Sequence, residues 1–211
     1  MQTGKLTRNI TLIIVLLGIC IGGYALYDRG RPAPVPAKQT LFEGVTYRRV
    51  VRYLPRPMIT HVLVIDTKAK GIAFLVTPPD SGEAQPLKAR TTSQFLEEFG
   101  VQIAVNGDKF QPWWSNGPAD YYPRAGDPIA PAGFSASNGD IYSIGDIEEA
   151  GIEPTLYISR RNGLSFNNRP NRIYSAISGD RMIVQKGEPV ADLDDGELEP
   201  RTALGINRTG R

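Results

Sequence analysis

The sequence contains a single cysteine, Cys20, and a single histidine, His61. One cysteine cannot form an intrachain disulfide. One histidine excludes any metal site that needs two histidine ligands, and it argues against a histidine-dependent catalytic triad. His61 itself fits two interpretations, a half-buried side chain bonded to the backbone or a polar group at the rim of a site.

The sequence also lacks an excess of charge of either sign. Its 24 Lys and Arg residues against 22 Asp and Glu residues give a net charge of +2, with no dense basic block. This composition gives no reason to expect a nucleic-acid partner. The 22 glycines and 17 prolines predict many turns and a β-rich domain, and nothing in the composition identifies a cofactor.

Long apolar runs are absent except near the amino terminus, at Ile10–Leu26, which Lys5 and Arg8 precede. About 17–18 apolar residues are just enough to cross a bilayer as a helix, and the positive flank favours a cytoplasmic amino terminus. We therefore predict a cytoplasmic segment at 1–9 and a transmembrane signal anchor at 10–27, with the rest in the periplasm or extracellular space. A cleaved signal peptide is the alternative.

Residues 28–40 are rich in proline and predict an extended linker. The region 41–211 then reads as one domain in which short apolar runs alternate with turn residues. A helix is expected at Thr91–Phe99, because Thr91 and Gln94 have the spacing of a capping box. Strands are expected at Val45–Tyr53, Thr60–Asp66 and Gly71–Val76.

Turn chemistry dominates the carboxyl-terminal half. Asn-Gly pairs at 138–139 and 162–163 predict two β-hairpins. The segment Gln111–Pro131 has no periodicity and is interpreted as a loop that forms a lid or a wall. The acidic segment Asp192–Glu199 is interpreted as a solvated loop. The predicted fold class is α+β, with a mixed, largely antiparallel sheet and few helices, preceded by one transmembrane helix.

The most informative stretch is Val101–Phe110. Its first five residues alternate in the manner of a strand with one buried face, and they lead directly into Asn106, Gly107 and Asp108. A strand end would hold a carboxylate and an amide rigidly beside the aromatic ring of Phe110. Such a group suits a sugar or a sugar phosphate, although a plain hairpin turn is the alternative interpretation.

A strand headed by an arginine is expected at 201–207. The residues that follow have the composition of a turn, yet no return strand follows them in the sequence. A strand without a partner exposes backbone donors and acceptors. The sequence therefore predicts that the domain is cut short.

In their order and spacing, these segments resemble the phosphodiester glycosidase domain family. That family includes the enzyme that uncovers mannose 6-phosphate on lysosomal proteins and bacterial exported proteins associated with exopolysaccharides. The sequence departs from the family pattern at Lys109, where the family usually has Phe. It also lacks the Asp-Gly-Gly-Gly-Ser segment that the family has further along the chain. The matching segments are HVLVID at 61–66, TTSQFLEEFGVQIAVNGDKF at 91–110, GFSASNGDIYS at 133–143, AISGD at 176–180 and RTALGIN at 201–207.

The resemblance implies hydrolysis of a sugar-1-phosphodiester, with Asp108 and Arg201 as catalytic residues. It implies no identified cofactor or metal. A glycosidase of this kind usually needs a second carboxylate, expected from the missing segment, so the chain could be inactive. The alternatives are a non-catalytic glycan-binding protein and an assembly factor of an export system. The implied substrate-binding residues are Asn106, Gly107, Phe110, Ser178, Gly179 and Thr202.

Overall fold

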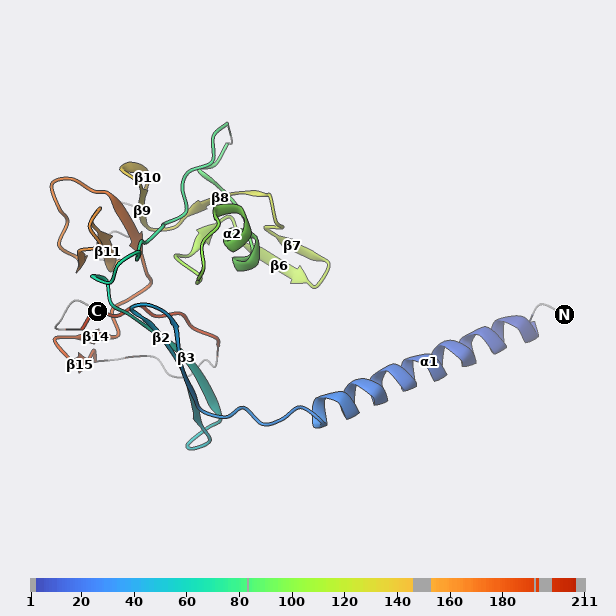
Figure 1. The fold of residues 1–211 in the computed structure, drawn as a ribbon. Coiled ribbons are helices and arrows are strands. Elements are labelled where there is room, and N and C mark those ends of the chain that lie inside the picture. Colours follow the sequence, from blue (N-terminus) through green and yellow to red (C-terminus); the bar gives the residue numbers. More distant parts are fainter. Residues whose placement is uncertain (1–2, 83, 146–152, 192, 194–198, 208–211) are drawn as a thin grey trace. The chain divides into compact units, whose positions relative to one another are not determined.

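A computed structural model describes residues 3–82, 84–145, 153–191, 193 and 199–207 (Figure 1). The chain divides into two compact units. One consists of Met1–Leu41 with Thr46–Leu63, and the other of Phe42–Val45 with Val64–Arg211.

The first unit contains a helix, α1 (Thr3–Arg29), and most of a three-stranded sheet. The sheet has the order β1 (Ala37–Phe42), β2 (Val45–Arg52) and β3 (Met58–Ile65). β2 and β3 confirm the first two strands predicted from the sequence. His61 on β3 lies 2.8 Å from the hydroxyl oxygen of Tyr47 on β2, measured to Nδ1, and the two rings stack. The histidine therefore bonds to a side chain of its own sheet.

The apolar side chains along the middle of α1 are exposed, with Leu16 at 53% and Ile19 at 65% of full exposure. In the part of the chain that the structure describes, however, no helix has both the length and the apolarity to span a membrane. The transmembrane helix that the sequence predicts is therefore not supported by the structure.

The second unit is built on a five-stranded sheet with the order β10-β9-β13-β11-β12. The Asn-Gly turns close two of its hairpins, β9–β10 and β11–β12, as predicted. Asn138 and Asn162 have φ angles of 53° and 59°, which asparagine tolerates better than most residues. Neighbouring strands in this sheet are antiparallel. The strands are β9 (Phe134–Ser137), β10 (Asp140–Ile144), β11 (Thr155–Ile158), β12 (Leu164–Phe166) and β13 (Ser175–Ser178).

β11 is the centre of the core, because all four of its residues are buried. Leu156 and Ile158 join Val76 in one apolar cluster. Tyr157, which points to the opposite face of the strand, joins a second cluster with Ala136 of β9. The sheet is therefore packed on both faces at this point.

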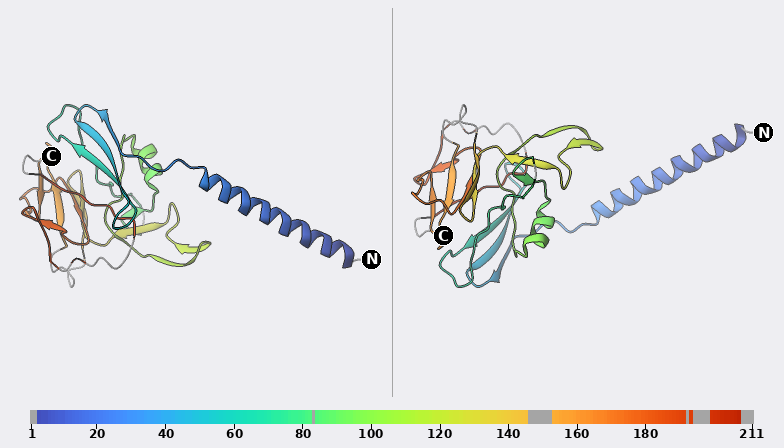
Figure 2. Two further views of the ribbon diagram at one scale, coloured as in Figure 1. Left: turned by 90° about the horizontal axis from the view of Figure 1, so that it is seen from below. Right: turned by 90° about the horizontal axis from the view of Figure 1, so that it is seen from above.

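A smaller group of elements precedes the sheet. The helix α2 (Thr92–Phe99) has the predicted capping box between Thr91 and Gln94, and it ends at Gly100 with φ 60°. Three short strands form a second sheet in the order β4-β8-β5. β6 and β7 pair with each other and form the hairpin that is drawn in yellow-green in Figure 2. These short strands are β4 (Leu87–Lys88), β5 (Phe110–Gln111), β6 (Trp114–Gly117), β7 (Asp120–Tyr122) and β8 (Pro128–Pro131). After the main sheet, β14 (Val184–Gln185) pairs with β15 (Glu188–Pro189) in a separate two-stranded sheet.

The prediction of an irregular loop at Gln111–Pro131 was wrong, since this segment contains β6, β7 and β8. The β6–β7 hairpin is held by a cross-strand pair, Trp114 opposite Tyr122, whose rings stack with centroids 6.3 Å apart. Stacked aromatic pairs stabilise a hairpin without apolar alternation. Periodicity alone therefore missed it.

Three predicted strands do not form. Residues 71–76, 101–105 and 201–207 contain no strand. Alternating apolar residues indicate an extended chain with one inward face, but a strand also needs a hydrogen-bonded neighbour. Val76, for example, is buried in the core without belonging to a ladder. The α+β class itself is confirmed, because the described residues form two helices and mostly antiparallel sheets.

Candidate functional site

Asp108 is half-buried and held by two backbone donors. Its Oδ1 accepts a hydrogen bond from the N–H of Lys109 at 2.7 Å, and its Oδ2 accepts one from the N–H of Gly133 at 2.9 Å. Burial raises the pKa of Asp108 above its usual value, although both backbone hydrogen bonds act to lower it. The carboxylate is therefore fixed in orientation by groups that cannot rotate away.

The loop that carries Asp108 is anchored at two further points. A β-carbon on Gly107 would lie 2.7 Å from Cδ1 of Ile177, so the loop backbone packs closely against β13. Asn106 accepts a hydrogen bond through Oδ1 from the hydroxyl of Thr92, the first residue of α2, at 3.2 Å. The segment 106–108 thus contacts both α2 and the main sheet, as a rigid site requires.

Gly133, just before β9, brings several groups together. A β-carbon on Gly133 would lie 2.4 Å from Oε2 of Glu153, 2.5 Å from Cβ of Ser178 and 2.7 Å from Oδ2 of Asp108. Two carboxylates and one strand of the main sheet therefore converge on a position where only glycine fits.

The predicted residues on β13 are engaged in the sheet. The buried hydroxyl of Ser178 donates to the carbonyl of Phe134 at 2.9 Å and also lies 3.2 Å from Oγ1 of Thr155. The N–H of Gly179 donates to the carbonyl of Pro154 at 2.9 Å. Because the hydroxyl proton of Ser178 is donated to Phe134, this side chain can only accept a hydrogen bond from a sugar hydroxyl.

Cationic side chains lie next to the Asp108 loop. The ammonium group of Lys109 forms an ion pair with Asp180, which follows β13, and this pair is the main reason why the pKa of Asp180 is lowered. The positive charges of Arg181 and Arg201 lower it further. Arg201 is therefore within electrostatic range of Asp180, the partner of Lys109.

Arg201 and Thr202 lie in an exposed segment. The Arg201 guanidinium forms an ion pair with Glu199 at 2.5 Å, and its side chain is 64% exposed. Phe110, on β5, is 37% exposed. A small hollow of about 230 Å³ adjoins β5 and the residue before Gly133. It is lined by Gln111, Ala130, Pro131, Ala132, Ser143 and Gly145.

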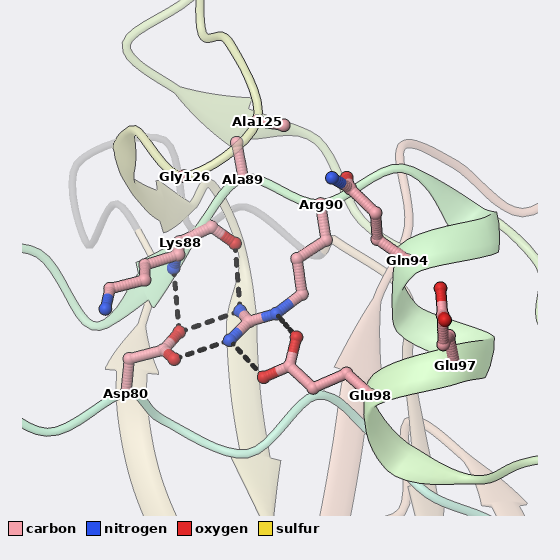
Figure 3. A pocket seen from close by; sticks show the side chains of 9 residues that line it. All are labelled: Asp80, Lys88, Ala89, Arg90, Gln94, Glu97, Glu98, Ala125 and Gly126. Atoms are coloured by element: carbon pink, nitrogen blue, oxygen red, sulfur yellow. Dashed lines mark hydrogen bonds and ion pairs between the residues drawn. The ribbon is translucent and has the colours of Figure 1, made fainter.

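A larger hollow, of about 520 Å³, lies at the start of α2 (Figure 3). The guanidinium of Arg90 dominates it and is 11% exposed. Its five N–H groups are all engaged: they donate to both carboxylate oxygens of Asp80, to both of Glu98 and to the carbonyl of Lys88, over 2.5–3.1 Å. This arginine therefore joins three segments and has no donor left for a phosphate.

Arg90→Lys is expected to destabilise the protein by about 2 kcal/mol, because an ammonium group cannot form two bidentate pairs at once. Thermal denaturation followed by circular dichroism measures this change. Lys70→Arg, an exposed substitution of the reverse kind, is the control and should shift the free energy of unfolding by less than about 0.5 kcal/mol. Equal stability of Arg90→Lys and the wild type would contradict the structural role of this arginine.

Sequence reasoning missed three residues of the candidate site: Gly133, Glu153 and Asp180. Gly133 and Asp180 lie at the ends of two segments that resemble the family, at 133–143 and 176–180, but nothing in those segments gives either residue a role. Glu153 lies in none of the matching segments. Lys109 stands out in the sequence only because it occupies a position where the family usually has Phe.

The comparisons with known proteins add one finding. The family model described as phosphodiester glycosidase matches residues 99–211, more than half of the chain. The match includes Asp108, Gly133, Glu153 and Arg201, whereas Arg90 lies outside it. No curated protein and no solved structure matches significantly. The chain belongs to the phosphodiester glycosidase family.

Proposed function

We propose that the protein hydrolyses a sugar-1-phosphodiester at the bond between the anomeric carbon and the phosphate oxygen. Water supplies the new oxygen on the sugar, and the electron pair of the broken bond leaves with the phosphate monoester. The observation that carries this proposal is the Asp108 carboxylate, oriented by two backbone N–H groups next to the cationic Lys109.

The charge of each side chain decides whether it suits the sugar or the phosphate of the substrate. Phosphate is a good leaving group, so protonating it matters less than stabilising the positive charge that develops on the sugar. Asp108 suits that role or the deprotonation of water. Arg201 and Lys109 suit the phosphate, because a guanidinium binds oxyanions through two parallel hydrogen bonds and an ammonium acts as a point charge. Asn106, Gly107, Phe110, Ser178, Gly179 and Thr202 are the proposed contacts to the substrate.

The direct test supplies the full chain with the methyl phosphodiester of N-acetylglucosamine 1-phosphate in ¹⁸O-labelled water. Cleavage at the anomeric carbon puts the label on the released sugar, and ³¹P NMR shows an unlabelled phosphate monoester. Label in the phosphate would mean attack at phosphorus and would overturn the proposal. So would the absence of turnover for this and other sugar-1-phosphodiesters.

A non-catalytic glycan-binding function is the second candidate. The β6–β7 hairpin and the residue before it expose three aromatic rings: Trp113 at 67%, Trp114 at 43% and Tyr121 at 43%. Flat aromatic faces next to polar groups suit sugar rings. Binding of an envelope glycan without turnover, lost in Trp113→Ala, would favour this candidate.

Export and membrane attachment stay predictions from the sequence. The exposed apolar side chains of α1 support attachment. Cell fractionation tests it: full-length protein should sediment with membranes and resist carbonate extraction. Recovery in the soluble fraction would reject attachment.

A further inference from the structure

Glu153 occupies a distinctive position two residues before β11. Its backbone carbonyl accepts a hydrogen bond from the hydroxyl of Thr155 at 3.3 Å, which links it to the first residue of the strand. Its side chain reaches across to Gly133, where Oε2 lies 2.4 Å from the point that a β-carbon would occupy. Oδ2 of Asp108 lies 2.7 Å from the same point.

Because Oε2 of Glu153 and Oδ2 of Asp108 both lie so close to one point, they are separated by no more than about 5 Å, which does not exceed the separation of about 5–5.5 Å between the carboxyl groups of retaining glycosidases. Inverting enzymes need about 6.5–9.5 Å, to leave room for a water between the two groups. The absence of a side chain on Gly133 is what permits this approach.

We infer that Glu153 is the second carboxylate of the site and that it works with Asp108 in a retaining mechanism. This inference rests on the proposed function and deepens it. The resemblance to the family assigns the second carboxylate to no residue of the sequence, whereas Glu153 provides one within the described part of the chain.

The environments of the two carboxylates distinguish their roles. Asp108 is half-buried and held by two backbone donors, and burial raises its pKa, which suits a group that accepts and releases a proton. Glu153 is exposed, so it is accessible to an anomeric carbon. Glu153 is therefore the nucleophile, and Asp108 is the group that moves the proton.

The reaction then has two balanced steps. In the first step, a Glu153 oxygen forms an ester bond to the anomeric carbon. The bond from that carbon to the phosphate oxygen breaks, and the electron pair leaves with the phosphate monoester. In the second step, water attacks the same carbon and transfers its proton to Asp108. The ester bond breaks and regenerates the Glu153 carboxylate.

The main test compares Glu153→Gln with Glu188→Gln, a control that removes an exposed carboxylate on β15. On the methyl phosphodiester of N-acetylglucosamine 1-phosphate, Glu153→Gln should lower kcat by at least about 100-fold. Glu188→Gln should stay within about twofold of the wild type. Both variants should melt near the wild-type temperature, because both positions are exposed. Proton NMR of the first product formed should show the anomer of the substrate.

A second variant tests the nucleophile directly. Glu153→Ala with added azide should recover part of the lost rate and release a glycosyl azide of inverted configuration, because azide replaces the missing carboxylate. A wild-type enzyme that turns over while Glu153→Gln keeps kcat within about threefold would overturn the inference. A product of inverted configuration from the wild type would do the same.

A readout independent of activity separates this inference from the proposed function. Carboxyl ¹³C NMR follows the titration of Asp108 in the wild type and in Glu153→Gln. Loss of a neighbouring negative charge should lower the pKa of Asp108, and an unchanged titration would overturn the pairing. If the wild type shows no turnover, the proposed function fails, and the titration still decides whether the two carboxylates interact.

Discussion

Replacing Asp108 with asparagine is expected to lower kcat for sugar-1-phosphodiester cleavage by about 1,000-fold, within the range of general acid–base catalysis. The amide has nearly the shape of the carboxylate, but it neither accepts a proton from water nor carries the negative charge that faces the sugar. The change is measured by steady-state kinetics with the same methyl phosphodiester.

Stability has to be measured alongside the rate. Asparagine offers one acceptor where Asp108 uses two, so either the N–H of Lys109 or that of Gly133 loses its partner. A donor left unsatisfied costs about 1–3 kcal/mol, and removal of a half-buried charge offsets part of that cost. The variant should therefore remain folded at 25 °C while its activity is lost.

Asp140→Asn is the matched control, because Asp140 is an exposed aspartate at the start of β10. Its kcat should stay within about twofold of the wild type. If Asp108→Asn also cleaved the substrate at a rate within about threefold of the wild type, Asp108 would have no catalytic role, whatever the stability of the variant.

The raised pKa of Asp108 adds a prediction about pH. Burial favours the protonated form in the folded state, so the folded protein holds a proton at pH values where the unfolded chain has released it. The contribution of Asp108 to stability is therefore fully present below its unfolded pKa of about 3.9 and is lost as the pH rises through its higher folded value. Across that window the wild type should lose stability relative to Asp108→Asn, as urea denaturation at several pH values would show.

The same raised pKa should appear in the pH dependence of the rate. The midpoint of the acidic limb of the rate profile should lie above the ordinary pKa of an aspartate.

The sequence predicted the position of Asp108 for a reason that was only partly correct. Asp108 does lie at a fixed place, but no strand leads into it and residues 106–108 form no regular turn. The segment before it alternates in burial at Val101, Gln102 and Ile103, as an extended chain with one inward face would. Asp108 is fixed by the N–H of Lys109 next to it and by the N–H of Gly133, 25 residues further along the chain.

The contacts that the sequence could not predict all join distant parts of the chain. Lys109 and Asp180 are 71 residues apart and pair because the sheet brings the end of β13 next to the Asp108 loop. In the sequence, no pattern distinguishes Glu153 from the nearby glutamates at 148–149. Turn residues, capping residues and hydrophobic periodicity are all local features of the sequence, so they predicted α2 and the two Asn-Gly hairpins. Local features give no information on which loops meet across a sheet.

Gly133→Ala is expected to cause the largest structural effect, a loss of about 3 kcal/mol in the free energy of unfolding, or about 6–12 °C in Tm. The added carbon would lie within 3 Å of three atoms, and these differ in their freedom to move. Oε2 of Glu153 ends a flexible side chain and can withdraw. Cβ of Ser178 belongs to a buried strand of the main sheet, so the backbone at residue 133 must move instead.

That movement should also abolish activity, because it removes the N–H of Gly133 from Oδ2 of Asp108 and drives the two carboxylates apart. Gly205→Ala is the control: a β-carbon there meets nothing within 4 Å, so its Tm should change by less than about 2 °C. A double variant isolates the cause. Adding Ser178→Gly to Gly133→Ala removes the immovable carbon, so the two changes should cost less together than the sum of their separate costs. Additive losses would mean that the clash with β13 is not what makes glycine necessary at this position.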